Sequence, residues 1–149
     1  MTVNNAALSA KRSSGTLDHF CGDKLTLFAH TLNDATVVGV TGELDSCNIH
    51  HLNDYVHACI TGGRALVLDL SQLGFLAAQG ITSLFDIADE CALAGVEWVL
   101  VPGHAARRLL RICDPDGRLP LASSVDEALQ RISARVRPQA LLQLVAKPG

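Results

Sequence analysis

The spacing of apolar and polar residues changes several times along the chain, and each change predicts a new element. Residues 24–30 (KLTLFAH) alternate between polar and apolar side chains, as the residues of a half-buried β-strand do. Residues 36–42 (TVVGVTG) predict a second strand, and the turn-forming residues Asn33 and Asp34 lie between the two. Because the connection is short, we expect the two strands to form an antiparallel hairpin.

Four helices are predicted after the hairpin. Apolar residues recur at helical spacing over residues 47–60 and again over 81–91. Residues 104–113 (HAARRLLRIC) predict a basic helix. Ser124 is followed three residues later by Glu127, and this capping box predicts the start of a last helix.

Two nearly continuous apolar segments lie between the predicted helices and complete the expected sheet. Residues 65–70 (ALVLDL) and 96–101 (VEWVLV) are typical of central strands that are covered on both faces. Strands that alternate with helices after an opening hairpin predict an α/β fold. The expected architecture is a mixed, mostly parallel sheet, opened by an antiparallel hairpin and covered by about four helices.

The chain of 149 residues is long enough to bury one hydrophobic core, and we expect one domain with two flanking ends. Residues 1–22 are polar, small and aperiodic, which predicts a mobile N-terminal tail. Residues 23–134 contain the predicted strands and helices. Residues 135–149 form a C-terminal extension whose short apolar patch is expected to pack on the domain or on a second copy. The patch consists of Leu141, Leu142, Leu144 and Val145.

Composition and charge exclude several classes of function. The net charge is −3 and the pI is about 6.0, so no basic field predicts binding to nucleic acid or to anionic membranes. No apolar segment is long enough to span a membrane, and the N-terminus lacks the features of a secretory signal. We therefore expect a cytoplasmic protein. Hydrophobic residues make up 48% of the chain and charged residues only 18%, which predicts that a partner or a second copy covers apolar surface.

The five cysteines form neither a CxxC pair nor a spacing typical of metal ligands. Cys59 and Cys91 fall on the apolar stripes of predicted helices, so we expect them to pack in the core. Cys47 lies at the start of the first predicted helix, and Cys21 and Cys113 lie at the ends of elements. These last three are the candidates for a redox switch, because a thiol at a helix N-terminus has a lowered pKa.

We expect no metal, no cofactor and no catalytic centre. His50, Asp54 and His57 share one face of the first predicted helix, and such side chains can bind zinc. No fourth ligand accompanies them, so a solvated polar face is the simpler interpretation. The sequence also lacks the nucleophile-elbow, Walker, dinucleotide-binding and zinc-protease motifs. These observations predict a binding protein rather than an enzyme.

Four stretches occur in an order that is typical of a known family. They are TGELD (41–45), LVLDLSQLGF (66–75), FLAAQGI (75–81) and VEWVLVPGHAARRLLRI (96–112). Together they resemble the STAS domain, specifically the stand-alone bacterial anti-sigma factor antagonists, over residues 23–134. The resemblance implies that the chain sequesters an anti-sigma factor, which in this family is a kinase of the histidine-kinase-like ATPase type. Sequestration of that partner frees a sigma factor.

In these antagonists a turn of the pattern Phe-x-Asp-Ser-Ser-Gly contains a serine that the partner kinase phosphorylates, and the phosphorylated form releases the partner. Phe75 and Gly80 match the first and last positions of this pattern. Ala77 replaces the aspartate, Ala78 replaces the first serine, and Gln79 replaces the phosphorylated serine. Gln79 has no hydroxyl group, and it is also a poor N-cap for the helix that follows. The resemblance therefore implies an antagonist without the usual phosphoswitch.

The resemblance also places the partner-binding surface, on the loop after the second predicted strand and on the turn around Gln79. The implied contact residues are Asp45, Ser46, Cys47, Ala77, Ala78, Gln79, Gly80, Thr82 and Ser83. Asp45 or Ser46 is also expected to cap the first predicted helix. Asp69, at the end of a central strand, is expected to hold the neighbouring loop by hydrogen bonds.

Three alternatives stay open at the level of the sequence. The segment 77–79 could be a tolerated loop in a domain whose function lies elsewhere. The chain could be a scaffold that pairs only with other STAS chains. A thiol or a small molecule could also take the place of the phosphate, which would make the protein a redox or ligand sensor.

Overall fold

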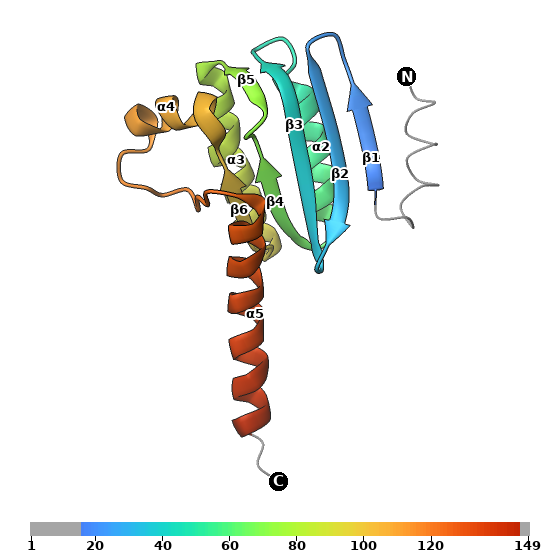
Figure 1. The fold of residues 1–149 in the computed structure, drawn as a ribbon, viewed down its shortest axis with the longest axis vertical. Helices are drawn as coiled ribbons and strands as arrows, with labels where there is room; N and C mark the ends of the chain where they lie inside the picture. The colour runs from blue at the N-terminus through green and yellow to red at the C-terminus, as the bar shows by residue number, and fades with distance from the viewer. Residues whose placement is uncertain (1–15, 147–149) are drawn as a thin grey trace.

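The computed structural model describes the backbone of residues 16–146 and the side chains of residues 21–135. Six strands form one sheet in the order β1-β2-β3-β4-β6, and β5 pairs with the end of β3 (Figure 1). The strands are β1 (Thr16–Cys21), β2 (Leu25–Leu32), β3 (Ala35–Leu44), β4 (Ala65–Asp69), β5 (Leu73–Leu76) and β6 (Trp98–Val101).

The strand directions confirm the expected mixed sheet. β1 pairs with β2 and β2 with β3 in antiparallel fashion, whereas the pairs β3–β4, β3–β5 and β4–β6 are parallel. The β2–β3 hairpin turns at Asn33 and Asp34, which have φ values of 51° and 69°. Asn and Asp tolerate this left-handed conformation, and hairpin turns require it.

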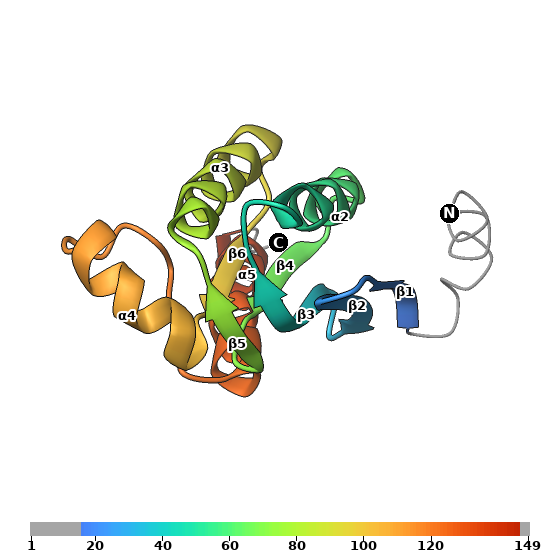
Figure 2. The same cartoon turned by 90° about the horizontal axis from the view of Figure 1, so that it is seen from above.

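Four helices cover the sheet in the described part of the chain, as expected: α2 (Ile49–Thr61), α3 (Ala78–Ala94), α4 (Gly103–Cys113) and α5 (Val125–Ala146). Figure 2 shows α2 and α3 on one face and α5 on the other, with α4 beside β5. The predicted capping box is present, because the Ser124 hydroxyl accepts the N–H of Glu127 at 3.1 Å. None of the helices in this described part combines the length and the apolar character needed to cross a bilayer.

Two apolar cores lie on the two faces of the sheet. Leu66 and Leu68 of β4 belong to the larger core, together with residues of α2, α3 and α4. Val67, between them in the strand, packs in the smaller core with Val99 of β6 and Leu129 of α5. β4 is therefore covered on both faces, which confirms the interpretation of its continuous apolar run.

Two strands, β1 and β5, are not predicted from the sequence. Residues 16–21 form β1, although the sequence places them in the mobile tail. The backbone of β1 pairs with β2, and such pairing leaves no clear local signal in a segment of six residues. β5 has only four residues, and its two middle residues, Gly74 and Phe75, are exposed. A pattern this short cannot be distinguished from a loop by periodicity.

The C-terminal helix is longer than expected. α5 continues past residue 135, where the sequence predicts an extension, and its backbone stays helical through Pro138 to Ala146. Figure 1 shows its second half extending beyond the sheet. The apolar patch at 141–145 lies on this half, but its side chains fall outside the described residues, and its packing stays a prediction.

Candidate protein-binding surface

Two loops leave the upper end of the sheet in Figure 1 next to each other, and they carry the residues that the sequence singles out. β3 and β5 pair in parallel up to their last residues. The N–H of Ala77 then donates a hydrogen bond to the carbonyl of Leu44 at 2.9 Å. The loop 45–48 and the turn 77–79 therefore start from one point. We call residues 45–48, 77–79 and 82 the two-loop surface.

The loop 45–48 is held by reciprocal hydrogen bonds between Asp45 and Asn48. One carboxylate oxygen of Asp45 accepts the N–H groups of Cys47 at 2.9 Å and of Asn48 at 3.2 Å. The side-chain carbonyl of Asn48 accepts the N–H of Asp45 at 2.9 Å. Asp45 thus fixes the turn that leads into α2. The capping role expected for Asp45 or Ser46 is wrong, because the N-cap of α2 is Asn48 and no side chain caps the helix there. The role of Asn48 in this turn was not predicted, although a polar residue three positions after Asp45 is a turn signal.

An ion pair and a small hollow flank this loop. The second carboxylate oxygen of Asp45 lies 3.7 Å from Nζ of Lys24, a residue that no motif picks out. A hollow of 280 Å³ opens beside the pair. It is lined by Gly22, Asp23, Lys24, Leu25, Asp45, Cys47, Asn48 and His51. Ser46 and Cys47 are exposed, so the loop presents a hydroxyl and a thiol on a fixed backbone.

The turn 77–79 leads directly into α3. Ala77 occupies the N-cap position, with φ −76° and ψ 160°, and no side chain caps the helix there. The N–H of Gly80 bonds back to the carbonyl of Ala77 at 2.8 Å. Gln79 lies in the first turn of the helix. The prediction that Gln79 occupies the N-cap position is therefore wrong, because the N-cap lies two residues earlier. The helix start lacks the roughly 1 kcal/mol that a Ser or Asp at position 77 would contribute.

The turn contains no group that could accept a phosphate. Ala78 and Gln79 are exposed, and neither has a hydroxyl. Thr82 is the first exposed hydroxyl along α3, and it lies one helical turn after Ala78. Asp86 and Asp89 are exposed at helical spacing from Thr82 and place two carboxylates on the same side of the helix. A phosphate on Thr82 would meet repulsion from these carboxylates.

Two of the implied contact residues face the core instead of a partner. Gly80 is buried, and a Cβ at this position would lie 2.3 Å from Cδ1 of Leu76. Ser83 is buried as well, with a relative exposure of 5%. Gly80 and Ser83 lie on the same side of α3 as the core residues Leu84 and Ile87, because residues three and four apart share one helix face. These two residues position the turn but do not line the two-loop surface.

Asp69 holds the turn between β4 and β5, as expected. Its carboxylate accepts the N–H of Ser71 at 3.0 Å. Gly103 packs on the same turn with a φ of 70°, and a Cβ there would lie 2.6 Å from the Cα of Ser71. The turn is therefore fixed from two sides, and with it the start of β5.

The cysteines divide into exposed and packed groups. Cys21, Cys47 and Cys113 are exposed, and no disulfide joins any of the cysteines in the described part of the chain. Cys91 is buried, and burial, with a smaller contribution from the charge of Glu90, raises the pKa of its thiol to about 12. A thiol with this pKa stays protonated and unreactive at neutral pH, which agrees with a packing role for Cys91. A redox role for the three exposed thiols stays a prediction.

The histidines of α2 lie along the exposed side of the helix. His57 pairs with the carboxylate of Glu90 and so connects α2 to α3. The rings of His50 and His51 lie 4.0 Å apart. Burial, and next the charge of His50, lower the pKa of His51, whereas the charge of Asp54 acts in the opposite direction. Within residues 21–135, no three His, Cys, Asp or Glu side chains are grouped so that they could hold a metal ion.

The sequence is similar to known proteins over most of its length. The family model of the STAS domain matches residues 28–128. Osmosensory protein A of Mycobacterium tuberculosis (strain ATCC 25618 / H37Rv) is 30% identical over 152 residues, which cover 98% of this chain and 95% of that protein.

Solved structures share the fold. The crystal structure of an anti-sigma factor antagonist from Mycobacterium paratuberculosis superimposes with a TM-score of 0.67 at 27% identity, over 74% of this chain and 96% of that one. The anti-sigma factor antagonist SpoIIAA in its unphosphorylated form gives a TM-score of 0.60 over 72% of this chain and 96% of that one. At 14% identity, this second likeness concerns the fold alone.

Proposed function

The chain belongs to the STAS domain family, and from this premise we propose that it is an anti-sigma factor antagonist whose two-loop surface binds an anti-sigma factor. The structural neighbour at 27% identity is itself described as an anti-sigma factor antagonist. In this role the protein acts by binding and not by catalysis, and it regulates transcription by setting a sigma factor free. The partner proposed is an anti-sigma factor of the histidine-kinase-like ATPase type.

One observation carries the proposal: Ala78 and Gln79 are exposed, and the hydrogen bond between Ala77 and Leu44 holds their turn beside the start of the loop 45–48. The two segments therefore start side by side and form one surface, although 28 residues separate them in the sequence. Rigid loops at the carboxyl ends of parallel strands are a usual place for binding sites in α/β folds.

The residues of the same surface favour an antagonist that is not regulated by phosphorylation. Gln79 is neutral and lacks a hydroxyl, and Ala77 and Ala78 bring neither an acid nor an alternative acceptor. Phosphorylation in this family adds a charge of about −1.5 to −2 at the start of a helix, and here that charge cannot be added at position 79. The protein would then stay in its binding form or be controlled in another way.

The proposal predicts that a bulky charged side chain on the turn blocks the partner. Ala78 is exposed at the start of α3, and Ala92 is exposed near the end of the same helix. Ala78→Arg is expected to raise the Kd for the purified anti-sigma factor from the same genome by at least about tenfold. Ala92→Arg is the matched control and should leave the Kd unchanged. Isothermal titration calorimetry measures both, and equal Kd values for the two variants would argue against this surface.

A redox or ligand sensor is a second candidate, and the exposed thiol of Cys47 beside the 280 Å³ hollow favours it. A bulky adduct on this thiol would change the two-loop surface directly. Binding of the anti-sigma factor under oxidising and reducing conditions separates the candidates, because an antagonist without a thiol switch binds equally in both. A scaffold that pairs only with other STAS chains would show no binding to the anti-sigma factor in either condition.

A further inference from the structure

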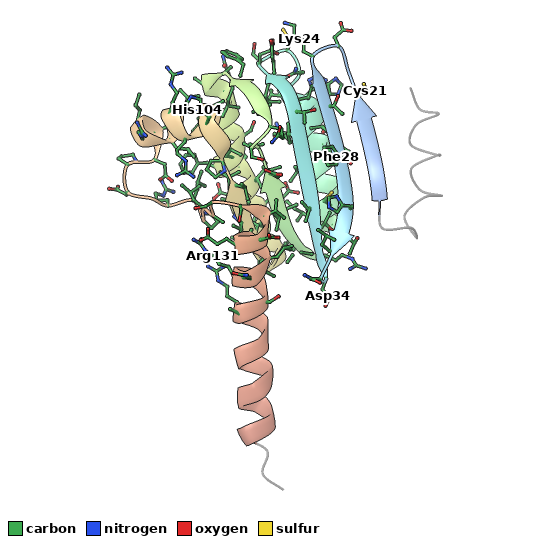
Figure 3. The ribbon with its side chains drawn as sticks, viewed as in Figure 1. Cys21, Lys24, Phe28, Asp34, His104 and Arg131 are labelled. Carbon is green, nitrogen blue, oxygen red and sulfur yellow. The ribbon has the colours of Figure 1, made fainter. Side chains whose placement is uncertain are left out.

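A groove lies between β5 and α4, and it shares no lining residue with the two-loop surface. It has a volume of 470 Å³. It is lined by Leu73, Gly74, Phe75 and Leu76 of β5 and by His104, Ala105, Arg108, Leu109 and Ile112 of α4. Figure 2 shows α4 beside β5, and Figure 3 labels His104 on α4. We call this site the β5–α4 groove.

The groove has exposed apolar walls. The side chain of Phe75 is 51% exposed and that of Ile112 is 77% exposed, and both are among the few large hydrophobic residues on the described surface. Leu109 also lines the groove and is half-buried. Exposed apolar side chains that line a hollow are typical of a binding site for apolar groups of a partner.

The rim of the groove is basic. His104, Arg108 and Arg111 lie at positions i, i+4 and i+7 of α4 and are exposed, so they form a row next to the apolar wall. In the described part of the chain, the ion pairs involve other basic residues, and no carboxylate neutralises Arg108 or Arg111. The chain as a whole has a charge of −3, so this row is a local excess of positive charge.

All four residues of β5 line the groove. Within the described sheet, β5 pairs with β3 and with no other strand. Its exposed residue Gly74 has no side chain to cover the peptide bonds. A strand beside a helix can accept an extended segment, whose side chains then contact the two walls.

The ends of this chain do not match the groove. Residues 1–15 contain Lys11 and Arg12, and residues 136–149 contain Arg137 and Lys147, but neither end contains Asp or Glu. Both ends would be repelled by the basic rim. The basic rim and the apolar walls together fit an occupant that brings negative charge and apolar side chains.

We propose that the β5–α4 groove is a second docking site, which binds an acidic partner segment with apolar side chains. The apolar side chains contact Phe75, Leu109 and Ile112, and the carboxylates pair with Arg108 and its basic neighbours. This site is separate from the two-loop surface, and the proposal does not depend on the identity of the anti-sigma factor.

The test uses fluorescence anisotropy with the full-length chain and two labelled synthetic peptides of equal length. One peptide alternates Glu and Leu, and the other alternates Lys and Leu. The Glu–Leu peptide is expected to bind saturably and more weakly as salt is added, and the Lys–Leu peptide is expected not to bind. Arg108→Glu and Ile112→Ser should each raise the Kd for the Glu–Leu peptide about tenfold. Both residues are exposed, so unchanged thermal melting will show that the fold is intact.

Matched controls lie on other surfaces. Arg64→Glu reverses an exposed arginine outside the groove, and Leu93→Ser removes an apolar side chain that is 90% exposed on α3. Both variants should bind the Glu–Leu peptide like wild type. No saturable binding, equal binding of the two peptides, or equal losses in test and control variants would overturn the proposal. Self-association of wild type that Ile112→Ser abolishes would also overturn it, because the occupant would then be a second copy.

Discussion

Replacing Gly42 with alanine is expected to lower the free energy of unfolding by about 3 kcal/mol or more. Gly42 has a φ of 101°, and a Cβ at this position would lie 2.0 Å from the carbonyl oxygen of Lys24. That oxygen accepts the N–H of Glu43 at 2.8 Å, so it cannot move away without breaking a hydrogen bond. Urea denaturation of the two proteins measures the difference.

Gly117 supplies the control for this prediction. Its φ is 68°, but a Cβ there would meet no atom within 4 Å. Gly117→Ala is therefore expected to cost only the backbone strain of a left-handed residue, about 1 kcal/mol. Equal losses for Gly42→Ala and Gly117→Ala would show that the approach of Lys24 to Gly42 does not constrain this part of the sheet.

The close approach at Gly42 also matters for the binding surface. The register of β3 with β5 shifts between Gly42 and Glu43, directly before the loop 45–48. A displacement of Gly42 would therefore move the carbonyl of Leu44, which holds the turn 77–79 through Ala77. Gly42 is part of the TGELD stretch, and its geometry gives a physical reason for a glycine there.

Gln79→Asp is expected to weaken binding of the anti-sigma factor by about 3 kcal/mol, roughly a hundredfold in Kd. The new carboxylate would be desolvated at the contact without a partner, as a phosphate would be. An acidic residue in the first turn of α3 is favourable for the helix itself, so the loss cannot come from unfolding. Asn has the same shape as Asp but no charge, so Gln79→Asn should bind the anti-sigma factor with a Kd within a few-fold of that of wild type. Similar affinities for the Asp and Asn variants would contradict the contact at position 79.

The hydrophobic pattern predicts most of the fold because the central strands and the helices bury long, regular apolar stripes. β4 and β6 are recognisable by continuous apolar runs, and the β2–β3 hairpin by its Asn33-Asp34 turn. β1 and β5 are stabilised by backbone pairing with β2 and β3, and the local periodicity of a short segment does not report such pairing. The length of α5 could not be predicted from the spacing of its apolar residues or from capping residues, because a proline such as Pro138 normally ends a helix.

The position of the candidate site was predictable, but the direction of its side chains only in part. The motif around Gln79 locates the turn, and the structure adds that the loop 45–48 lies beside it. Gly80 and Ser83 were expected at the contact and are buried. Helical spacing to Leu84 and Ile87 could have shown this, had the start of α3 been known. The roles of Lys24 and Asn48 depend on three-dimensional contacts that the sequence does not show.

The most direct test of an antagonist without a phosphoswitch is to incubate the chain with ATP and the purified anti-sigma kinase. Phosphate is then mapped by mass spectrometry, and the complex is followed by gel filtration. A family member with the switch serine serves as the positive control. For an antagonist without a phosphoswitch, we expect no phosphate on residues 75–83 and a complex that persists in ATP. A stoichiometric phosphate on Thr82 or Ser83 that releases the partner would contradict this expectation.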